Sequence, residues 1–300
     1  MTRLVAEPQH LLITLLGDYW WGRRELIPSA ALVDLLAEFG ATESSSRQAM
    51  RRLTNQGLLV QKKVGRTTSY GIPARISEAQ SSRLRRAMSF GSDFTDWDGR
   101  WTVVSFSVPE KERGVRRLLR NGLRDMRFGL LHDAIWVTPH DRARQAGRLL
   151  DDLGVESAVV MRSELLPRAG GFSPFHDVFE LDSLAEAYEE FIERHEPEIG
   201  RVHSGRVTPS EALVLRTELM NEWLSFRLKD PELPITALPQ NWPRPHARKV
   251  FLAIYDGLGE SAEVRFKHIV GLVAPELAEF ASYHTSTSPE VVDEDRSDWV

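Results

Sequence analysis

Residues 42–72 read TESSSRQAMRRLTNQGLLVQKKVGRTTSYGI, and this stretch narrows the possible folds sharply. Its first part has apolar residues at helical spacing and ends at Gly57, and Thr42 or Ser44 can cap that helix. Two strand-like runs follow, Leu58–Lys63 and Thr67–Ile72, with a turn around Gly65 between them. A helix followed directly by a two-stranded hairpin is the second half of a winged helix-turn-helix.

Two further helices precede this stretch, as a winged helix requires. Pro8–Tyr19 has apolar residues at helical spacing, and Pro28 begins a second helix that stops at Gly40. We therefore expect a winged helix-turn-helix domain over residues 1–75. A linker over 76–99 follows, with a basic helix at about Ser77–Phe90.

In the middle of the chain, predicted strands alternate with predicted helices. Six predicted elements occur in the order β-α-β-β-α-β, which is that of a ferredoxin-like domain over residues 100–181. They are Trp101–Val108, Glu110–Met126, Phe128–Leu131, Ala134–Val137, Arg142–Leu153 and Ser157–Glu164.

The last third is predicted to be an all-helical domain over residues 182–284. Its helices are Leu184–His195, Pro209–Leu228, Pro245–Leu258 and a weaker one across Ala262–Tyr283. Five prolines in residues 229–249 argue against regular structure there and predict an extended connection. Residues 285–300 are polar and acidic and are expected to be a disordered tail. The fold class is thus α+β.

Charge is distributed unevenly over these segments. The chain carries a net charge of −5, but residues 1–90 carry +6, residues 91–181 carry −1 and residues 182–300 carry −10. A basic N-terminal third on an acidic body suggests that one end binds a polyanion. The alternative is chance segregation of surface charge.

The chain contains no cysteine, which excludes disulfides, thiol catalysis and cysteine-containing zinc sites. We find neither a signal-peptide pattern nor an apolar run of the ~18 residues that a membrane helix needs. We therefore expect a cytoplasmic protein without membrane contact.

The predicted helix of residues 44–57 has two unlike faces. Ser46, Ala49, Met50 and Leu53 share the side that would pack on the first two helices. The other side is rich in cations and in the Arg, Gln and Ser side chains that read base edges in the major groove. From the helix we expect DNA contacts by Ser44, Ser45, Arg47, Gln48, Arg51 and Arg52, and from the hairpin by Lys62, Lys63, Arg66, Thr67 and Thr68. A solvated helix, or a winged helix that binds protein, remains the alternative.

Several segments together resemble the phenylacetic-acid degradation repressor (PaaX) family of bacterial transcription regulators. They include LLITLLGDY, SSRQAMRRLTNQGLL with GRTTSYGI, DGRWTVVSFSVPE, FGLLHDAIWVTPHD and EWLSFRLKDPELPITALPQNWPRPHARKVFLAIYDGL. Each is weak alone, but five in the right order are specific, and the resemblance extends up to the acidic tail.

The resemblance implies a winged helix, a ferredoxin-like middle domain and a helical C-terminal domain. It also implies a homodimeric repressor that binds a roughly palindromic operator and is released by an aryl-acetyl-CoA thioester, typically phenylacetyl-CoA. No other cofactor is implied. One alternative remains: a regulator of the same fold that responds to another ligand, or that activates other genes.

A CoA thioester needs cations for its phosphates and an apolar slot for its acyl end. The C-terminal region supplies both, and the expected effector contacts are Arg216, Trp223, Arg227, Trp242, Arg248 and Lys249. Two alternatives weigh against them: tryptophans at helical spacing are more often core residues, and the basic helix around residues 113–124 is a rival phosphate surface.

The middle segment also resembles the small ferredoxin-like subunit of CRISPR adaptation complexes, whose first strand ends near a metal-binding acid. Here Ser105 and Ser107 stand where an aspartate is expected, and Glu110 comes only after Pro109. The chain has no HExxH, GxGxxG, Walker or GxSxG motif. We therefore expect no enzyme, with a metal-dependent nuclease as the disfavoured alternative.

Overall fold

The computed structural model describes residues 7–73, 76, 84–92, 97–165 and 175–288. The chain divides into two compact units that do not follow its order. The first unit comprises residues 1–90, 192–228 and 246–294, and the second comprises residues 91–191, 229–245 and 295–300. Residues of the C-terminal helices occur in both units.

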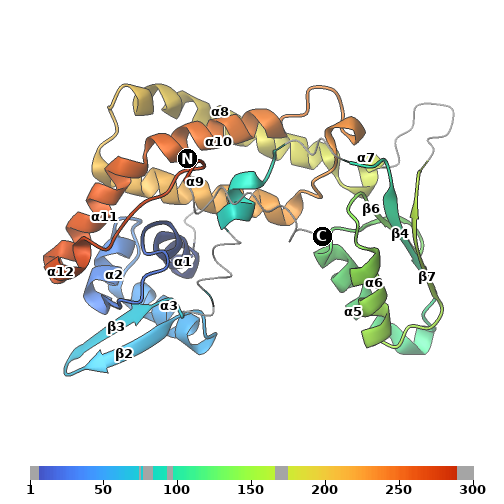
Figure 1. The fold of residues 1–300 in the computed structure, drawn as a ribbon, viewed down its shortest axis with the longest axis horizontal. Helices are drawn as coiled ribbons and strands as arrows, with labels where there is room; N and C mark the ends of the chain where they lie inside the picture. Colours follow the sequence, from blue (N-terminus) through green and yellow to red (C-terminus); the bar gives the residue numbers. More distant parts are fainter. Residues whose placement is uncertain (1–6, 74–75, 77–83, 93–96, 166–174, 289–300) are drawn as a thin grey trace. The chain divides into compact units, whose positions relative to one another are not determined.

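The first unit begins with three helices and a hairpin (Figure 1). In chain order these are α1 (Pro8–Tyr19), β1 (Ile27–Pro28), α2 (Ser29–Ala37), α3 (Glu43–Asn55), β2 (Val60–Val64) and β3 (Thr67–Gly71). Fully buried leucines of α1 and α2 form the core on which α3 packs through Ala49, Met50 and Leu53. Gly40 joins α2 to α3 with a φ of +80°, which glycine adopts without strain.

The hairpin of β2 and β3, called the wing below, closes through Gly65 and Arg66. Gly65 has a φ of +61° at the first loop position, as a two-residue hairpin turn requires. β3 lies in the middle of a three-stranded sheet of order β1-β3-β2. Tyr70 is buried beneath the wing, which anchors its base to the helices.

Helical segments from the C-terminal part of the chain complete the first unit. They belong to α8 (Leu181–His203), α9 (Pro209–Lys229), α10 (Arg244–Gly257), α11 (Gly259–Val273) and α12 (Pro275–Ala278). α11 packs on α2, where Arg265 donates two hydrogen bonds to Glu38 at 3.0 and 2.7 Å. The Arg265 hydrogen bonds hold the pKa of Glu38 below its ordinary value.

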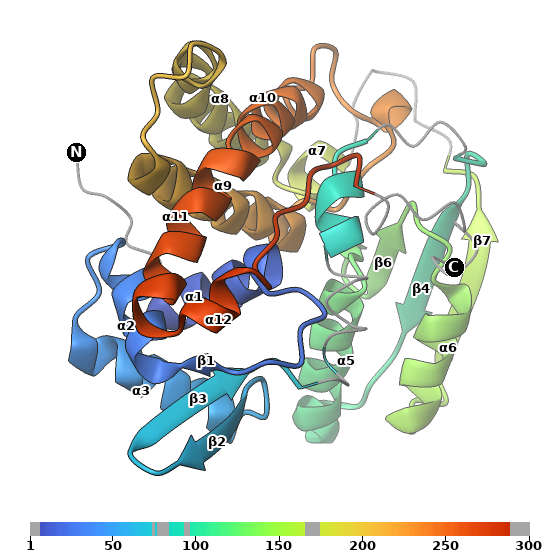
Figure 2. The same cartoon turned by 60° about the vertical axis from the view of Figure 1, so that its left-hand side comes forward.

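The second unit contains a four-stranded antiparallel sheet of order β5-β6-β4-β7. The strands are β4 (Trp101–Phe106), β5 (Gly129–His132), β6 (Ile135–Thr138) and β7 (Ala158–Ser163). Figure 2 shows α5 (Arg113–Asp125) and α6 (Ala143–Asp152) along one face of this sheet. Val104, Phe106 and Trp136 form the core between the sheet and these helices.

A buried ion pair holds the proline-rich connection in the second unit. Arg244, 1% exposed, binds both carboxylate oxygens of Asp230 at 3.2 and 3.3 Å and donates to the Leu233 carbonyl at 2.8 Å. Tyr188 donates to the same carboxylate at 2.7 Å. The prolines restrict the backbone of this segment, and the ion pair fixes where it lies.

The α+β fold class expected from the sequence is confirmed, including the β-α-β-β-α-β middle and the helical C-terminal region. Several boundaries differ: α8 extends from Leu181 to His203, and the helix expected across Ala262–Tyr283 is two helices, α11 and α12. The basic helix begins at Arg113, after a separate 3-10 turn at Glu110–Glu112. α10 begins at Arg244, and a 3-10 turn at Ile235–Ala237 interrupts the segment expected to lack regular structure. Of the linker helix, residues 84–89 are described as helical, and of the expected tail, residues 289–300 lie outside the described range.

Candidate nucleic-acid interface

α3 presents a polar face to solvent because its apolar residues all point the other way. Ser46, Ala49, Met50 and Leu53 are buried. Ser44, Arg47, Gln48, Arg51 and Arg52 are exposed. Thr42 caps the helix, since its hydroxyl accepts a hydrogen bond from the Ser45 N–H at 3.2 Å.

Two of the expected contact residues already have partners on α3. The Ser45 hydroxyl is half-buried and donates to the Thr42 carbonyl at 2.9 Å, so Ser45 belongs to the cap. Arg47 pairs with Glu43 one turn earlier, at 2.8 Å. This i,i+4 ion pair neutralises one cation of the face. Gln48, Arg51 and Arg52 carry the exposed hydrogen-bonding groups of the face.

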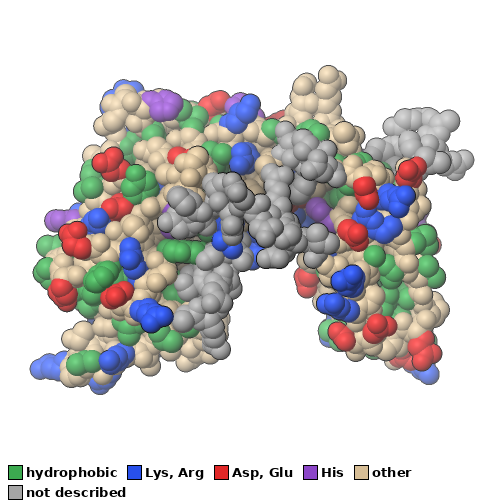
Figure 3. All heavy atoms as spheres, viewed as in Figure 1, with side chains coloured by type: hydrophobic (Ala, Val, Ile, Leu, Met, Phe, Trp, Pro, Cys, Tyr) green, Lys and Arg blue, Asp and Glu red, His purple; other side chains and the backbone are tan. Residues whose placement is uncertain are grey.

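The wing residues divide between the two faces of the hairpin. Lys62 and Thr67 share one face and Lys63 and Thr68 the other, because side chains alternate along each strand and the register pairs Lys63 with Thr68. Arg66 extends from the turn. In Figure 3 basic side chains gather at this tip, at the lower left. A cationic tip beside an acid-poor helix face suits a phosphate backbone better than an acidic protein surface.

We expect Thr42→Ala to lower the free energy of unfolding by about 1 kcal/mol, since it leaves the first-turn N–H groups of α3 without a side-chain acceptor. Urea unfolding followed by tryptophan fluorescence measures this loss. Ser44→Ala is the matched control, because Ser44 is exposed in the same turn and its hydroxyl caps nothing. Equal losses in both variants would show that the Thr42 cap is not the cause of the loss.

The residues expected to contact an effector differ in burial and belong to both units. Trp242 belongs to the second unit and the other five to the first. Arg216 and Trp223 are 0% exposed and have no free surface to offer a ligand. Trp223 stacks on Phe251 at 4.7 Å between ring centroids and donates to the Ala87 carbonyl at 2.9 Å. The more accessible members are Arg227, Arg248 and Lys249.

Arg216 is the centre of a buried polar cluster that ties α1 to the C-terminal segments. Its guanidinium donates to the Tyr255 carbonyl at 2.9 Å and to the His284 carbonyl at 2.6 Å, and lies 3.6 Å from the Asp18 carboxylate. The Tyr255 hydroxyl donates to Asp18 at 3.0 Å. Burial raises the pKa of Asp18 to about 6, although Arg216 and Tyr255 act in the opposite direction.

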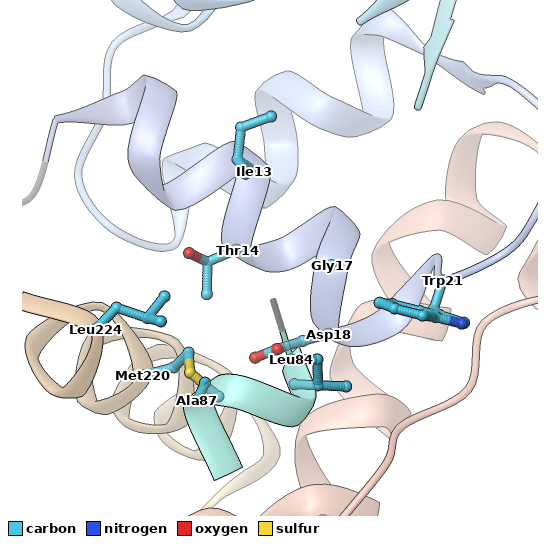
Figure 4. Close-up of a pocket in the computed structure, with 9 residues that line it drawn as sticks. All are labelled: Ile13, Thr14, Gly17, Asp18, Trp21, Leu84, Ala87, Met220 and Leu224. Carbon is cyan, nitrogen blue, oxygen red and sulfur yellow. The ribbon is translucent and has the colours of Figure 1, made fainter. Parts of the chain in front are cut away.

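A small pocket, partly open to solvent, lies beside this cluster (Figure 4). α1, residues 84–89 and α9 form its wall. The lining residues are Ile13, Thr14, Gly17, Asp18, Trp21, Leu84, Ala87, Met220 and Leu224. None of these described lining residues is a cation, so their chemistry suits a small apolar group and not a phosphate. This pocket was not predicted from the sequence, where Asp18, a lone acid at the end of an apolar helix, was the available signal.

The rival basic helix, α5, uses part of its charge internally. Arg113 and Arg116 both bind Glu110. Arg124 lies over the Trp136 ring, 5.4 Å from its centroid. Arg117 is exposed on this helix.

Among the residues that the structure describes, no group of three or more His, Asp or Glu side chains could hold a metal ion. Within the same residues, no helix combines the length and apolar character needed to cross a membrane.

Comparison with known proteins assigns the family. Three family models match in succession: the PaaX-like protein model at residues 7–76, the central Cas2-like domain of PaaX at 95–170 and the PaaX-like C-terminal domain at 179–268. The chain belongs to the PaaX family. The models follow the order of the winged helix, the four-stranded sheet and the C-terminal helices in this PaaX-family protein.

One curated relative agrees with this assignment, and one solved structure shares the fold. The chain is 25% identical over 264 residues to the transcriptional repressor PaaX of Escherichia coli (strain K12). This match covers 84% of this chain and 80% of that protein. The solved structure of uncharacterized protein Rv0674 from Mycobacterium tuberculosis superposes with a TM-score of 0.55 at 20% identity, over 87% of this chain and 98% of that one. The second likeness concerns the fold alone.

Proposed function

We propose that this PaaX-family protein is a DNA-binding transcriptional regulator, a repressor that reads an operator with α3 and the wing. The observation that carries this proposal is the exposed, cation-rich face of α3, where Gln48, Arg51 and Arg52 stand beside the basic wing. The related repressor from Escherichia coli supports it. Catalysis is not part of the proposal.

The finer proposal is a cytoplasmic homodimer released by a ligand. Two copies would place two α3 helices in successive major grooves of a roughly palindromic site, about 34–36 Å apart or a multiple of that distance. Phenylacetyl-CoA or a related acyl-CoA thioester would favour another arrangement and so weaken binding. Arg227, Arg248 and Lys249 are the candidate phosphate contacts, because they are the more accessible cations of the expected set.

A fluorescence-anisotropy titration tests the proposal. The promoter DNA beside the protein's own gene is titrated at fixed salt, with and without phenylacetyl-CoA, against a scrambled duplex of equal length. Specific binding that the thioester reverses supports both parts. Specific binding that ignores the thioester supports the regulator and removes this effector. Binding no tighter than to the scrambled duplex argues against operator recognition there and favours a winged helix that binds protein.

Lys62→Ala should reduce the salt dependence of DNA binding by one phosphate contact. Lys62 is exposed on the wing, and each phosphate contact contributes about 0.9 to the slope of log K against log salt concentration. The slope is measured by titration at several salt concentrations on both duplexes. Lys111→Ala, an exposed lysine in the second unit, serves as the control and should leave it unchanged. An unaltered slope for Lys62→Ala removes this contact from the interface.

A further inference from the structure

The small pocket beside the Arg216 cluster contains a buried carboxylate oxygen that accepts no hydrogen bond. Asp18 is 3% exposed, and Figure 4 shows it extending from α1 toward the other lining residues. Its Oδ1 accepts a hydrogen bond from the Tyr255 hydroxyl at 3.0 Å. Among the described residues, none donates to its Oδ2. Thr14, the neighbouring polar residue of the lining, already donates its hydroxyl to Asn221 at 2.8 Å. A buried acceptor without a donor is destabilising, so Oδ2 favours a ligand that donates a hydrogen bond.

A glycine in α1 gives such a ligand room. Gly17 lines the same pocket, and a Cβ added to it would meet no heavy atom of another segment within 4 Å. Glycine within a helix is less stable than alanine, and here no close neighbour requires its small size. The space in front of Gly17 is therefore part of the pocket, and a side chain at this position would enter it.

Arg216 restricts the chemistry of the ligand. Its Nη1 lies 3.6 Å from Oδ2 of Asp18, too far for a hydrogen bond, and has no other partner among the described residues. A single oxygen atom placed about 2.8 Å from both can donate to the carboxylate and accept from the guanidinium. A hydroxyl group meets both requirements. An ammonium group has donors only and is repelled by Arg216, whereas a carboxylate is repelled by Asp18.

We propose that this pocket binds a small neutral alcohol or phenol, with its hydroxyl between Asp18 and Arg216 and its apolar body in front of Gly17. Ile13 and Leu224 are among the side chains that supply apolar contacts for the body. All of these residues belong to the first unit, and they come from α1 of the winged helix and from α9. The bound ligand therefore contacts the winged helix and a C-terminal helix together.

This site is separate from the acyl-CoA effector proposed above, because it uses neither a phosphate nor a thioester. The inference also does not depend on operator binding. The tests below use the full chain without DNA, so their outcome is distinguishable from that of the operator titration.

Isothermal titration calorimetry of the full chain at about pH 8 tests the ligand class with phenol, toluene and benzylamine. The pKa of Asp18 is about 6, so its carboxylate is ionised at this pH. Phenol should bind saturably at one site per chain. Toluene, which lacks the hydroxyl, and benzylamine, which is protonated, should each bind at least tenfold more weakly. Absence of saturable phenol binding overturns the proposal. Toluene or benzylamine that binds as tightly as phenol also overturns it, since the hydroxyl would then have no role.

Gly17→Ala tests the location of the site without removing any side chain. Its methyl group enters the pocket and should weaken phenol binding at least tenfold. The variant should fold normally, because alanine favours a helix more than glycine does.

Gly147→Ala is the matched control for this substitution. Gly147 also lies within a helix, α6 of the second unit, and an added Cβ would likewise meet no heavy atom of another segment within 4 Å. This variant should bind phenol as the unsubstituted chain does. Unchanged affinity in Gly17→Ala, or equal weakening in both variants, overturns the proposed site. The comparison of the three probes on the unsubstituted chain does not depend on how either variant folds.

Discussion

Arg216→Met is expected to lower the free energy of unfolding by about 3–5 kcal/mol, because it leaves the Asp18 carboxylate buried beside no cation. Arg216 is 0% exposed, and Asp18 is 3% exposed. The substitution also removes the donors to the Tyr255 and His284 carbonyls, which lie at 2.9 and 2.6 Å from Arg216. Urea unfolding monitored by tryptophan fluorescence measures the loss.

Two comparisons identify the cause of this loss. Asp18→Asn combined with Arg216→Met removes both charges and should recover part of the stability lost in Arg216→Met alone. Arg201→Ala breaks exposed ion pairs with Glu198 and Glu211 and should change stability little. If the double variant is no more stable than Arg216→Met, the unpaired buried charge is not the main cause of the lost free energy of unfolding. Lost hydrogen bonds and packing then account for the effect.

Arg51→Ala is expected to weaken operator binding by about 1–3 kcal/mol while leaving non-specific binding nearly unchanged. Arg51 is exposed on the side of α3 opposite its buried residues. An arginine that binds a guanine through two hydrogen bonds contributes to discrimination, whereas one that binds phosphate weakens all sequences alike. The affinity for operator and for scrambled duplex, measured at one salt concentration, separates the two roles.

Arg148→Ala controls for the loss of one positive charge. Arg148 is exposed on α6 in the second unit, and its removal should change neither affinity. Equal weakening of operator and scrambled duplex by Arg51→Ala would assign Arg51 to the phosphate backbone and leave base reading to Gln48 or Arg52.

The α3 face was predictable because its signals lie within a few residues of one another. Apolar spacing placed Ala49, Met50 and Leu53 on the inner side, and the structure buries all three. Thr42 and Ser44 were both possible caps from the sequence, and in the structure Thr42 is the cap. The pairing of Arg47 with Glu43 is equally local, at four residues' separation, and was overlooked.

The surroundings of Arg216 and Trp223 were not predictable in the same way. Their spacing on one helix suggested a ligand site, but spacing shows only that two side chains share a face. Whether that face meets solvent depends on the segments that cover it. Here the Tyr255 and His284 carbonyls enclose Arg216, and Phe251 and the Ala87 carbonyl enclose Trp223.

The amino-acid sequence by itself determined the order of helices and strands, the α+β class and the two unlike faces of α3, since periodicity, caps and turns act over a few residues. Only the tertiary structure decided which C-terminal helices belong to the same unit as the winged helix, and which polar side chains are buried. Those outcomes depend on contacts between distant residues, such as Tyr255 with Asp18 across 237 positions. A local pattern carries no information about such partners, because burial and pairing arise only when the whole chain has folded.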